Sequence, residues 1–106
     1  MNWYVARTKP GYEKKLRDIV ISRGIEAYVP IRKTLCDAEL HTAGIIETVL
    51  EEGKVYIHAT EDERKSLFNI SILLRFDGSG TSRPLIIPDK QMESLIRSVD
   101  IGNEID

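Results

Sequence analysis

Two short apolar segments on either side of one amphipathic segment constrain this chain more than any other feature. Residues 3–8 are rich in aromatic and β-branched types, which favour a strand. Residues 12–23 carry apolar side chains at helical spacing, namely Tyr12, Leu16, Ile19 and Val20. Gly24 suits the left-handed position just past a helix end, and residues 27–35 predict a second strand that bends at Pro30. The first third of the chain therefore predicts a β–α–β unit.

A hairpin and a third strand are predicted next. Residues 36–44 are polar and without periodicity, and they lie between two β-branched runs, so residues 31–50 are interpreted as a protruding hairpin. Gly53 precedes a strand at residues 54–59. Alternation along this strand predicts two faces, with Val55, Ile57 and Ala59 on one and Lys54, Tyr56 and His58 on the other.

Two further helices complete the pattern. Thr60 and Glu63 form a capping box, and Leu67 and Phe68 are expected at the buried end of that short helix. Residues 72–76 predict a fourth strand and residues 77–82 a turn. Pro88-Asp89 begins a last helix with apolar residues at helical spacing, namely Met92, Leu95, Ile96 and Val99. The predicted fold class is α+β: an antiparallel four-stranded sheet with about three helices, in a ferredoxin-like arrangement with a protruding hairpin.

Composition narrows the classes of function. The net charge is −2, whereas proteins that depend on phosphate neutralisation carry a basic excess, so nucleic-acid contact is expected to be local at most. The lone Cys36 excludes an intrachain disulfide and predicts a reducing compartment, and we expect a cytoplasmic protein. No apolar run approaches the length of a membrane helix, and the N-terminus does not read as a signal peptide.

Residue types that carry chemistry do not assemble into an enzyme or cofactor motif. Cys36, His41 and His58 lack the spacing of a zinc site. The acidic run at residues 61–63 is explained by a helix N-terminus, and the turn with Ser79 lacks the lysine and helix of a phosphate loop. An acylphosphatase-like hydrolase would need an anion-cradling loop, for which residues 7–11 are the nearest candidate. We expect no enzyme, metal or cofactor.

Four segments in order resemble one family over residues 3–99, the N-terminal domain of NusG-type transcription elongation and antitermination factors. They are Trp3-Tyr4-Val5 with Thr8, Gly11 and Glu13, then residues 24–30, residues 53–57 and residues 86–92. The resemblance implies docking on the clamp helices of the largest subunit of RNA polymerase, with reach toward the gate loop of the other large subunit, so that pausing or termination is modulated. The chain also resembles short, specialised paralogues of the UpxY kind, which regulate surface-polysaccharide operons.

The resemblance further implies where the polymerase would bind. An apolar concavity that receives the clamp helices is expected to include Tyr56 and Ile86, with Tyr4 and Tyr12 extending it and Leu50 and Lys54 beside it; the turn at Asn69 and Ser71 faces the gate loop. One segment departs from the family: Leu50-Glu51-Glu52-Gly53-Lys54 stands where an aromatic-proline-glycine-aromatic run is usual. The same aromatic and apolar residues are also typical of core or sheet-edge positions.

Two alternatives stay open from the residues themselves. A direct RNA- or ssDNA-binding module of RRM-like topology would need aromatic residues on an open sheet face, where only Tyr56 stands beside Lys54 and His58, with Arg75 on the next strand. The basic residues Lys14, Lys15 and Arg17 are typical of a solvated helix face, with local contact to non-template DNA as the alternative. We expect a monomer in which residues 1–99 form the domain and residues 100–106 begin a linker to a C-terminal KOW domain.

Overall fold

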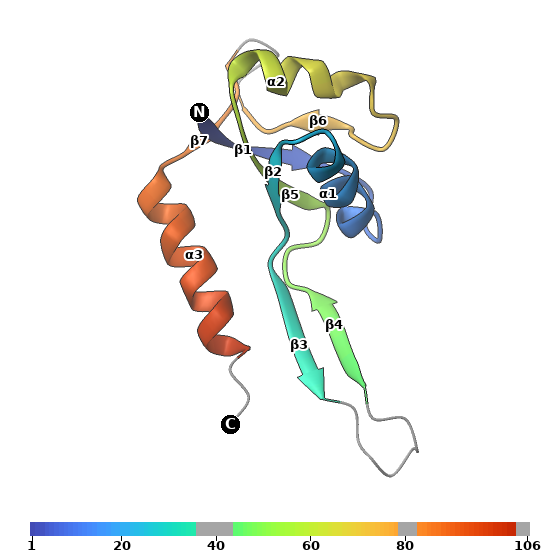
Figure 1. The fold of residues 1–106 in the computed structure, drawn as a ribbon, viewed down its shortest axis with the longest axis vertical. Helices are drawn as coiled ribbons and strands as arrows, with labels where there is room; N and C mark the ends of the chain where they lie inside the picture. Colours follow the sequence, from blue (N-terminus) through green and yellow to red (C-terminus); the bar gives the residue numbers. More distant parts are fainter. Residues whose placement is uncertain (36–43, 79–82, 104–106) are drawn as a thin grey trace.

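The computed structural model describes residues 1–35, 44–78 and 83–103 (Figure 1). Residues 36–43 of the expected loop, residues 79–82 of the expected turn and residues 104–106 lie outside those ranges, and with them Cys36, His41 and Ser79. In chain order the elements are β1 (Asn2–Arg7), α1 (Glu13–Ser22), β2 (Glu26–Tyr28), β3 (Ile31–Leu35), β4 (Ile45–Val49), β5 (Lys54–Ala59), α2 (Glu61–Ser66), the 3₁₀ turn η2 (Leu67–Asn69), β6 (Arg75–Phe76), β7 (Ile86–Ile87) and α3 (Asp89–Gly102). The predicted α+β class, with three helices and antiparallel sheets, is confirmed.

The main sheet is built around β1, the apolar strand predicted at residues 3–8. Its strand order is β2-β5-β1-β6, and β7 pairs with β1 beside β6. All pairings are antiparallel; on the β5 side Tyr4 lies opposite Ile57, and Val5 opposite Tyr56. The two short strands β6 and β7 pair with different halves of β1, so they share one edge of the sheet.

The predicted fourth strand is much shorter than expected, since only Arg75 and Phe76 of residues 72–76 pair with β1. The preceding residues are held in a turn instead: the Leu73 N–H donates to the Ile70 carbonyl at 3.1 Å. The Thr8 hydroxyl also donates to the Ile72 carbonyl at 2.7 Å. These hydrogen bonds satisfy backbone groups that a longer strand would have used, and the strand begins only after them.

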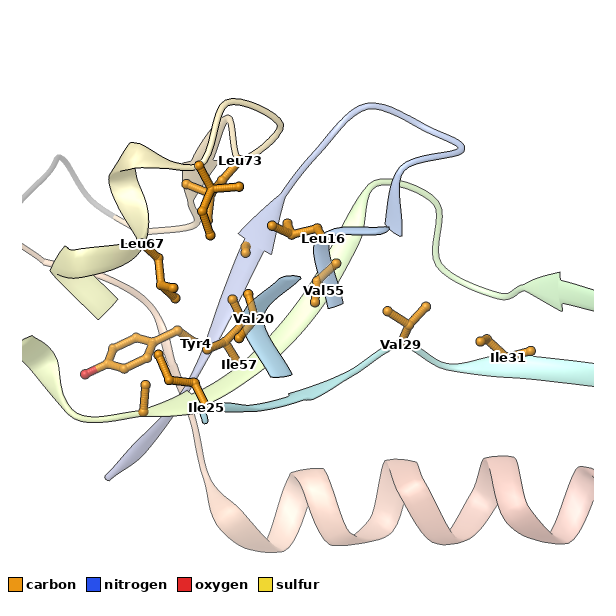
Figure 2. Packing of buried hydrophobic residues seen from close by; sticks show 13 residues of the cluster. Tyr4, Leu16, Val20, Ile25, Val29, Ile31, Val55, Ile57, Leu67 and Leu73 are labelled. Carbon is orange, nitrogen blue, oxygen red and sulfur yellow. The ribbon is translucent and has the colours of Figure 1, made fainter. Parts of the chain in front are cut away.

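The core lies between the sheet and the helices α1 and α2. Alternate residues of β1 and β5, including Tyr4 and Ile57, meet Leu16 and Val20 of α1 and Leu67 of η2 in one buried cluster (Figure 2). A smaller cluster on the other face of the sheet is covered by α3 and contains Trp3, Val5, Tyr56 and Met92. The strand alternation predicted for residues 54–59 is confirmed, because Val55, Ile57 and Ala59 belong to the first cluster and Tyr56 to the second.

Phe68 corrects one expectation about the helix at residues 61–66. The capping box between Thr60 and Glu63 is confirmed, and Leu67 is fully buried, but Phe68 is 52% exposed. The tight winding of η2 turns these neighbouring side chains in different directions. The Phe68 ring therefore lies over the guanidinium of Arg64 and edge-on to Phe76, at the rim of the core.

The hairpin of β3 and β4 leaves the main sheet and extends away from it (Figure 1). It begins after Val29 and Pro30, where the predicted bend separates β2 from β3. In the middle of β4, Glu47 pairs with Lys14 of α1 at 3.1 Å. Helix α3 continues to Gly102, past Val99, the last apolar residue of the predicted helical pattern. In the part of the chain that the structure describes, no helix has both the length and the apolar character needed to cross a membrane.

Candidate partner-binding site

Charged side chains gather on the face of the sheet that α3 covers only in part. Residues directly opposite one another on paired strands share a face, and Arg7 lies opposite both Lys54 and Arg75. By the same alternation this face also carries Trp3 and Val5, over which Met92 of α3 packs. We call the charged end of this surface the ion-pair face, and it consists of Arg7, Glu51, Lys54, Tyr56, Arg75 and Asp77.

A bidentate contact of the ion-pair face joins Arg7 to Asp77. The guanidinium donates two hydrogen bonds to the carboxylate, Nε to Oδ1 at 2.8 Å and Nη2 to Oδ2 at 2.7 Å. Such a bidentate pair fixes the relative orientation of two planar groups. The hydrogen bond from Arg7 lowers the pKa of Asp77 below its usual value, and the same contact raises the pKa of Arg7. Both groups are therefore charged over the physiological range.

A second contact joins Tyr56, Glu51 and Lys54. The Tyr56 hydroxyl donates to the Glu51 carboxylate, at 2.7 Å to Oε1 and 3.2 Å to Oε2. Lys54 Nζ lies 3.6 Å from Glu51 Oε2. Burial of the ring, followed by its hydrogen bond to Glu51, raises the pKa of Tyr56, so the phenol stays protonated and remains a donor. The buried Tyr56 ring thus presents only its polar end to this face.

The turn that carries Glu51 is held by a buried carboxylate. Glu13, at the start of α1, accepts hydrogen bonds from the backbone N–H groups of Gly11 and Gly53, both at 2.8 Å. Gly53 has a φ of 74°, and a Cβ there would lie 2.9 Å from the Thr8 carbonyl oxygen. Burial tends to raise the pKa of Glu13, but hydrogen bonds from the backbone of Gly53, of Glu13 itself and of Gly11 outweigh it, and the pKa is lowered. The turn before β5 is therefore fixed against β1.

Some predicted binding residues lie on the opposite face. Tyr4 is buried, with 1% of its surface exposed, and its hydroxyl donates to Glu61 at 3.1 Å. Ile86 is 48% exposed and pairs with Tyr4, so it shares the face of Tyr4. The structure brings Tyr56 and Lys54 together but does not place Tyr4 or Ile86 beside them, because one residue of offset along β1 changes the face of the sheet.

The remaining predicted residues lie at the margins. Tyr12 and Ser71 both line a hollow of about 140 Å³, together with Thr8 and Leu74. The side chain of Asn69 is already hydrogen-bonded within the domain, since its oxygen accepts from Arg23 Nη1 at 2.8 Å. Leu50 is 42% exposed at the foot of the hairpin, where its N–H donates to the Pro30 carbonyl.

Sequence reasoning did not assign four members of the ion-pair face, Arg7, Glu51, Arg75 and Asp77, to the polymerase-binding surface. Trp3, Val5 and Arg7 are alternate residues of one strand, and this spacing places their side chains on the same face of the sheet. Nothing in the local sequence identifies Asp77 as the partner of Arg7, because the two residues are 70 positions apart.

The sheet does not offer the aromatic platform required for RRM-like recognition. Trp3 is buried under α3 and stacks on His58, with ring centroids 4.7 Å apart, and Tyr56 is buried as well. Base stacking needs an accessible ring face, which neither residue presents. Within residues 1–35, 44–78 and 83–103, no group of three or more His, Cys, Asp or Glu is placed to hold a metal ion. This surface offers fixed charges and hydrogen bonds to a partner.

Comparisons with known proteins give the family. The family model for NusG, described as transcription termination factor nusG, matches residues 1–96. A search of the curated proteins found no match. Among solved structures, NusG from Thermotoga maritima, from a study of its domain interaction, superposes with a TM-score of 0.63 at 19% identity over 98% of this chain and 60% of that one. At this identity the likeness shows the fold, and this chain spans about 60% of that protein's length. Because the family model covers nearly the whole chain, this protein belongs to the NusG family, a family of transcription factors rather than enzymes.

Proposed function

We propose that this domain docks on RNA polymerase, on the clamp helices of the largest subunit, and modulates pausing or termination. The observation that carries the proposal is the match of the NusG family model to residues 1–96, supported by the fold. The absence of an aromatic platform on the described part of the sheet argues against direct RNA binding as the main activity. Assignment to the specialised UpxY-like paralogues stays a prediction.

The ion-pair face is the surface that we assign to the clamp helices. It lies beside α3, so a partner helix seated on it would contact strands on one side and a helix on the other. Lys54 and Tyr56, two of the predicted binding residues, belong to it, and Leu50 lies near it at the foot of the hairpin. Its Tyr56 ring is held by Glu51, which gives the surface a defined shape before the partner arrives.

We assign the gate loop to the surface formed by Tyr12 and the turn at residues 69–71. The hollow between Tyr12 and Ser71 is small and is lined largely by apolar atoms and one lysine, Lys9. Asn69, two residues before Ser71 in the same turn, accepts a hydrogen bond from Arg23. Contact with non-template DNA is a smaller part of the proposal, because Lys14 and Arg17 of α1 are engaged with Glu47 and Asp18.

Binding to purified RNA polymerase of the source organism tests the proposal. Biolayer interferometry with the immobilised domain should detect the polymerase, and transcription on a template with a defined pause should show an altered pause lifetime. Tyr56→Ala and Lys54→Ala should weaken binding. Ile86→Ala is the matched surface variant on the opposite face, and it should bind as the wild type does.

Circular dichroism of each variant distinguishes a loss of folding from a loss of binding in this experiment. Tyr56 is buried, so Tyr56→Ala also removes core contacts, whereas Lys54 is partly exposed and its truncation leaves the core intact. Loss of binding in Ile86→Ala alone would move the docking site to the opposite face. A folded wild-type domain that does not bind polymerase would refute the proposed function.

A further inference from the structure

The ion-pair face carries more positive than negative charge, and two of its cations are available to a partner. The Arg7 guanidinium donates two hydrogen bonds to the Asp77 carboxylate, so Arg7 already has a partner. Glu51 is shared between the Tyr56 hydroxyl and Lys54, whose ammonium lies 3.6 Å away. Arg75 is exposed and forms no ion pair with any described residue. The surface therefore holds three basic and two acidic groups, with Arg75 unpaired and Lys54 weakly paired.

We propose that the polymerase segment that docks here is acidic, and that its carboxylates pair with Arg75 and Lys54. This inference rests on the proposed function and adds the chemistry of the partner. It makes recognition charge-selective, in contrast to the apolar concavity that the family resemblance implies. Glu51 and Lys54 stand at positions where the family usually has aromatic residues, so these two residues make the surface charged instead of apolar.

The cost of removing water from charged groups supports an acidic partner. An apolar segment seated on this face would strip water from Arg75 and Lys54 and offer no hydrogen bonds in return. A carboxylate would replace that water, and with arginine it can form two parallel hydrogen bonds. The existing pairs need not break, because both anions of the face already have their partners in the free protein.

The backbone positions that carry the two available cations are fixed before a partner binds. Lys54 and Arg75 lie on strands that both pair with β1, one on each side of Arg7. The Glu51 turn is held through Gly53 by the buried carboxylate of Glu13. Fixed positions reduce the ordering cost on association, so the charge pattern contributes to the choice of partner.

The test measures affinity for purified polymerase against salt concentration. Wild-type affinity should fall by roughly tenfold or more between low and moderately high salt, since partly exposed charge pairs are screened. Arg75→Glu and Lys54→Glu should each weaken binding by about tenfold or more at low salt and flatten the salt dependence. Arg97→Glu, an equal charge change at an exposed position of α3, is the control and should leave affinity within about twofold.

The outcomes separate this inference from the proposed function. If the wild type does not bind polymerase at any salt concentration, both are overturned. If it binds with an affinity that salt and Arg75→Glu leave unchanged, only the acidic-partner inference fails. Equal losses in Arg75→Glu and Arg97→Glu would attribute the effect to net charge and would also overturn it. Arg75 is exposed on a two-residue strand, and a thermal unfolding curve for each variant confirms that it is folded.

Discussion

Single residues with two partners hold the loops of this domain in place. Glu13 is 2% exposed, yet it is charged, because backbone N–H groups from two separate turns converge on its carboxylate. A buried carboxylate is tolerated only where such donors replace its water. The Arg7–Asp77 pair likewise joins β1 to the residue that follows β6, although the two residues are 70 positions apart.

Replacing Glu13 tests the first of these contacts. Glu13→Ala should lower the free energy of unfolding by about 2–3 kcal/mol, because two N–H donors lose a charged acceptor. Glu13→Gln keeps one acceptor oxygen and should lose about half as much. Urea unfolding followed by circular dichroism measures both, with Glu93→Ala on exposed α3 as the control. An alanine variant as stable as the control would mean that water replaces the carboxylate.

Acid should weaken the Arg7–Asp77 pair. The pKa of Asp77 is lower in the folded protein than its ordinary value of about 3.9 in an unfolded chain, so the unfolded chain binds the proton more tightly. The stability that this pair contributes is therefore fully present above about pH 5 and is lost as pH falls through about 4 toward the folded pKa. The lowered pKa of Glu13 acts in the same direction.

Urea unfolding at a series of pH values measures this effect. Asp77→Asn should be less stable than the wild type at neutral pH, by about 1–3 kcal/mol, and should lose less stability than the wild type on acidification. Arg7→Gln should behave alike, because it removes the hydrogen bonds that lower the pKa. A slope in Asp77→Asn as steep as that of the wild type would show that other carboxylates control the acid response.

At the scale of elements, short contacts at helix ends position the pieces. The hairpin of β3 and β4 is joined to the end of α3 by one side chain, because the Asn103 amide donates to the Ile31 carbonyl at 2.7 Å and accepts from the Lys33 N–H at 2.8 Å. These two backbone groups belong to the edge of β3, so the amide occupies the place of a neighbouring strand. The direction of the hairpin therefore depends on where α3 ends.

Hydrogen exchange of the Lys33 amide tests this contact. Asn103→Ala should speed exchange at Lys33 by about three- to tenfold, since one net hydrogen bond is lost there. Amides in β5 should exchange as in the wild type, because β5 lies in the main sheet. Ser94→Ala, at an exposed position of α3, is the control. Unchanged exchange at Lys33 would show that the Asn103 side chain does not protect the edge of the hairpin.

At the scale of the whole molecule, one sheet joins two buried clusters of unequal size. Helices α1 and α2 cover the larger cluster, whereas α3 covers the smaller one, chiefly through Met92. Both clusters draw on β1 and β5, so we expect them to unfold together. The single tryptophan, Trp3, lies in the smaller cluster and reports on α3 by its fluorescence.

Met92→Ala tests this coupling. Met92 is 1% exposed, and its truncation should lower the free energy of unfolding by about 2–5 kcal/mol because a cavity opens under α3. Unfolding followed by Trp3 fluorescence and by far-ultraviolet circular dichroism should still share one midpoint. A fluorescence transition at lower denaturant than the circular dichroism transition would mean that α3 detaches from the sheet by itself. Glu93→Ala again serves as the surface control.

Local patterns of residues decided most of the elements. The apolar spacing from Tyr12 to Val20, the capping box at Thr60 and the alternation of residues 54–59 involve neighbours in the chain, and the helices and strand form where these patterns predict them. The resemblance to NusG likewise rests on short segments, and the family match confirms it. The position of Tyr56 on one face and Val55 on the other also follows from alternation alone.

Contacts between distant segments decided the rest. Turn contacts near Ile70 and Ile72 shortened β6, and the packing of η2 left Phe68 exposed; neither has a local signal. Pairing with β1 set Tyr4 and Ile86 on the face opposite Tyr56, and it brought Asp77 to Arg7. The surface that we assign to a partner is made of side chains from β1, β5, β6 and the turn before β5, and its charge depends on which of them pair. Strand register is a long-range property, so only the tertiary structure could show that this surface is a set of ion pairs.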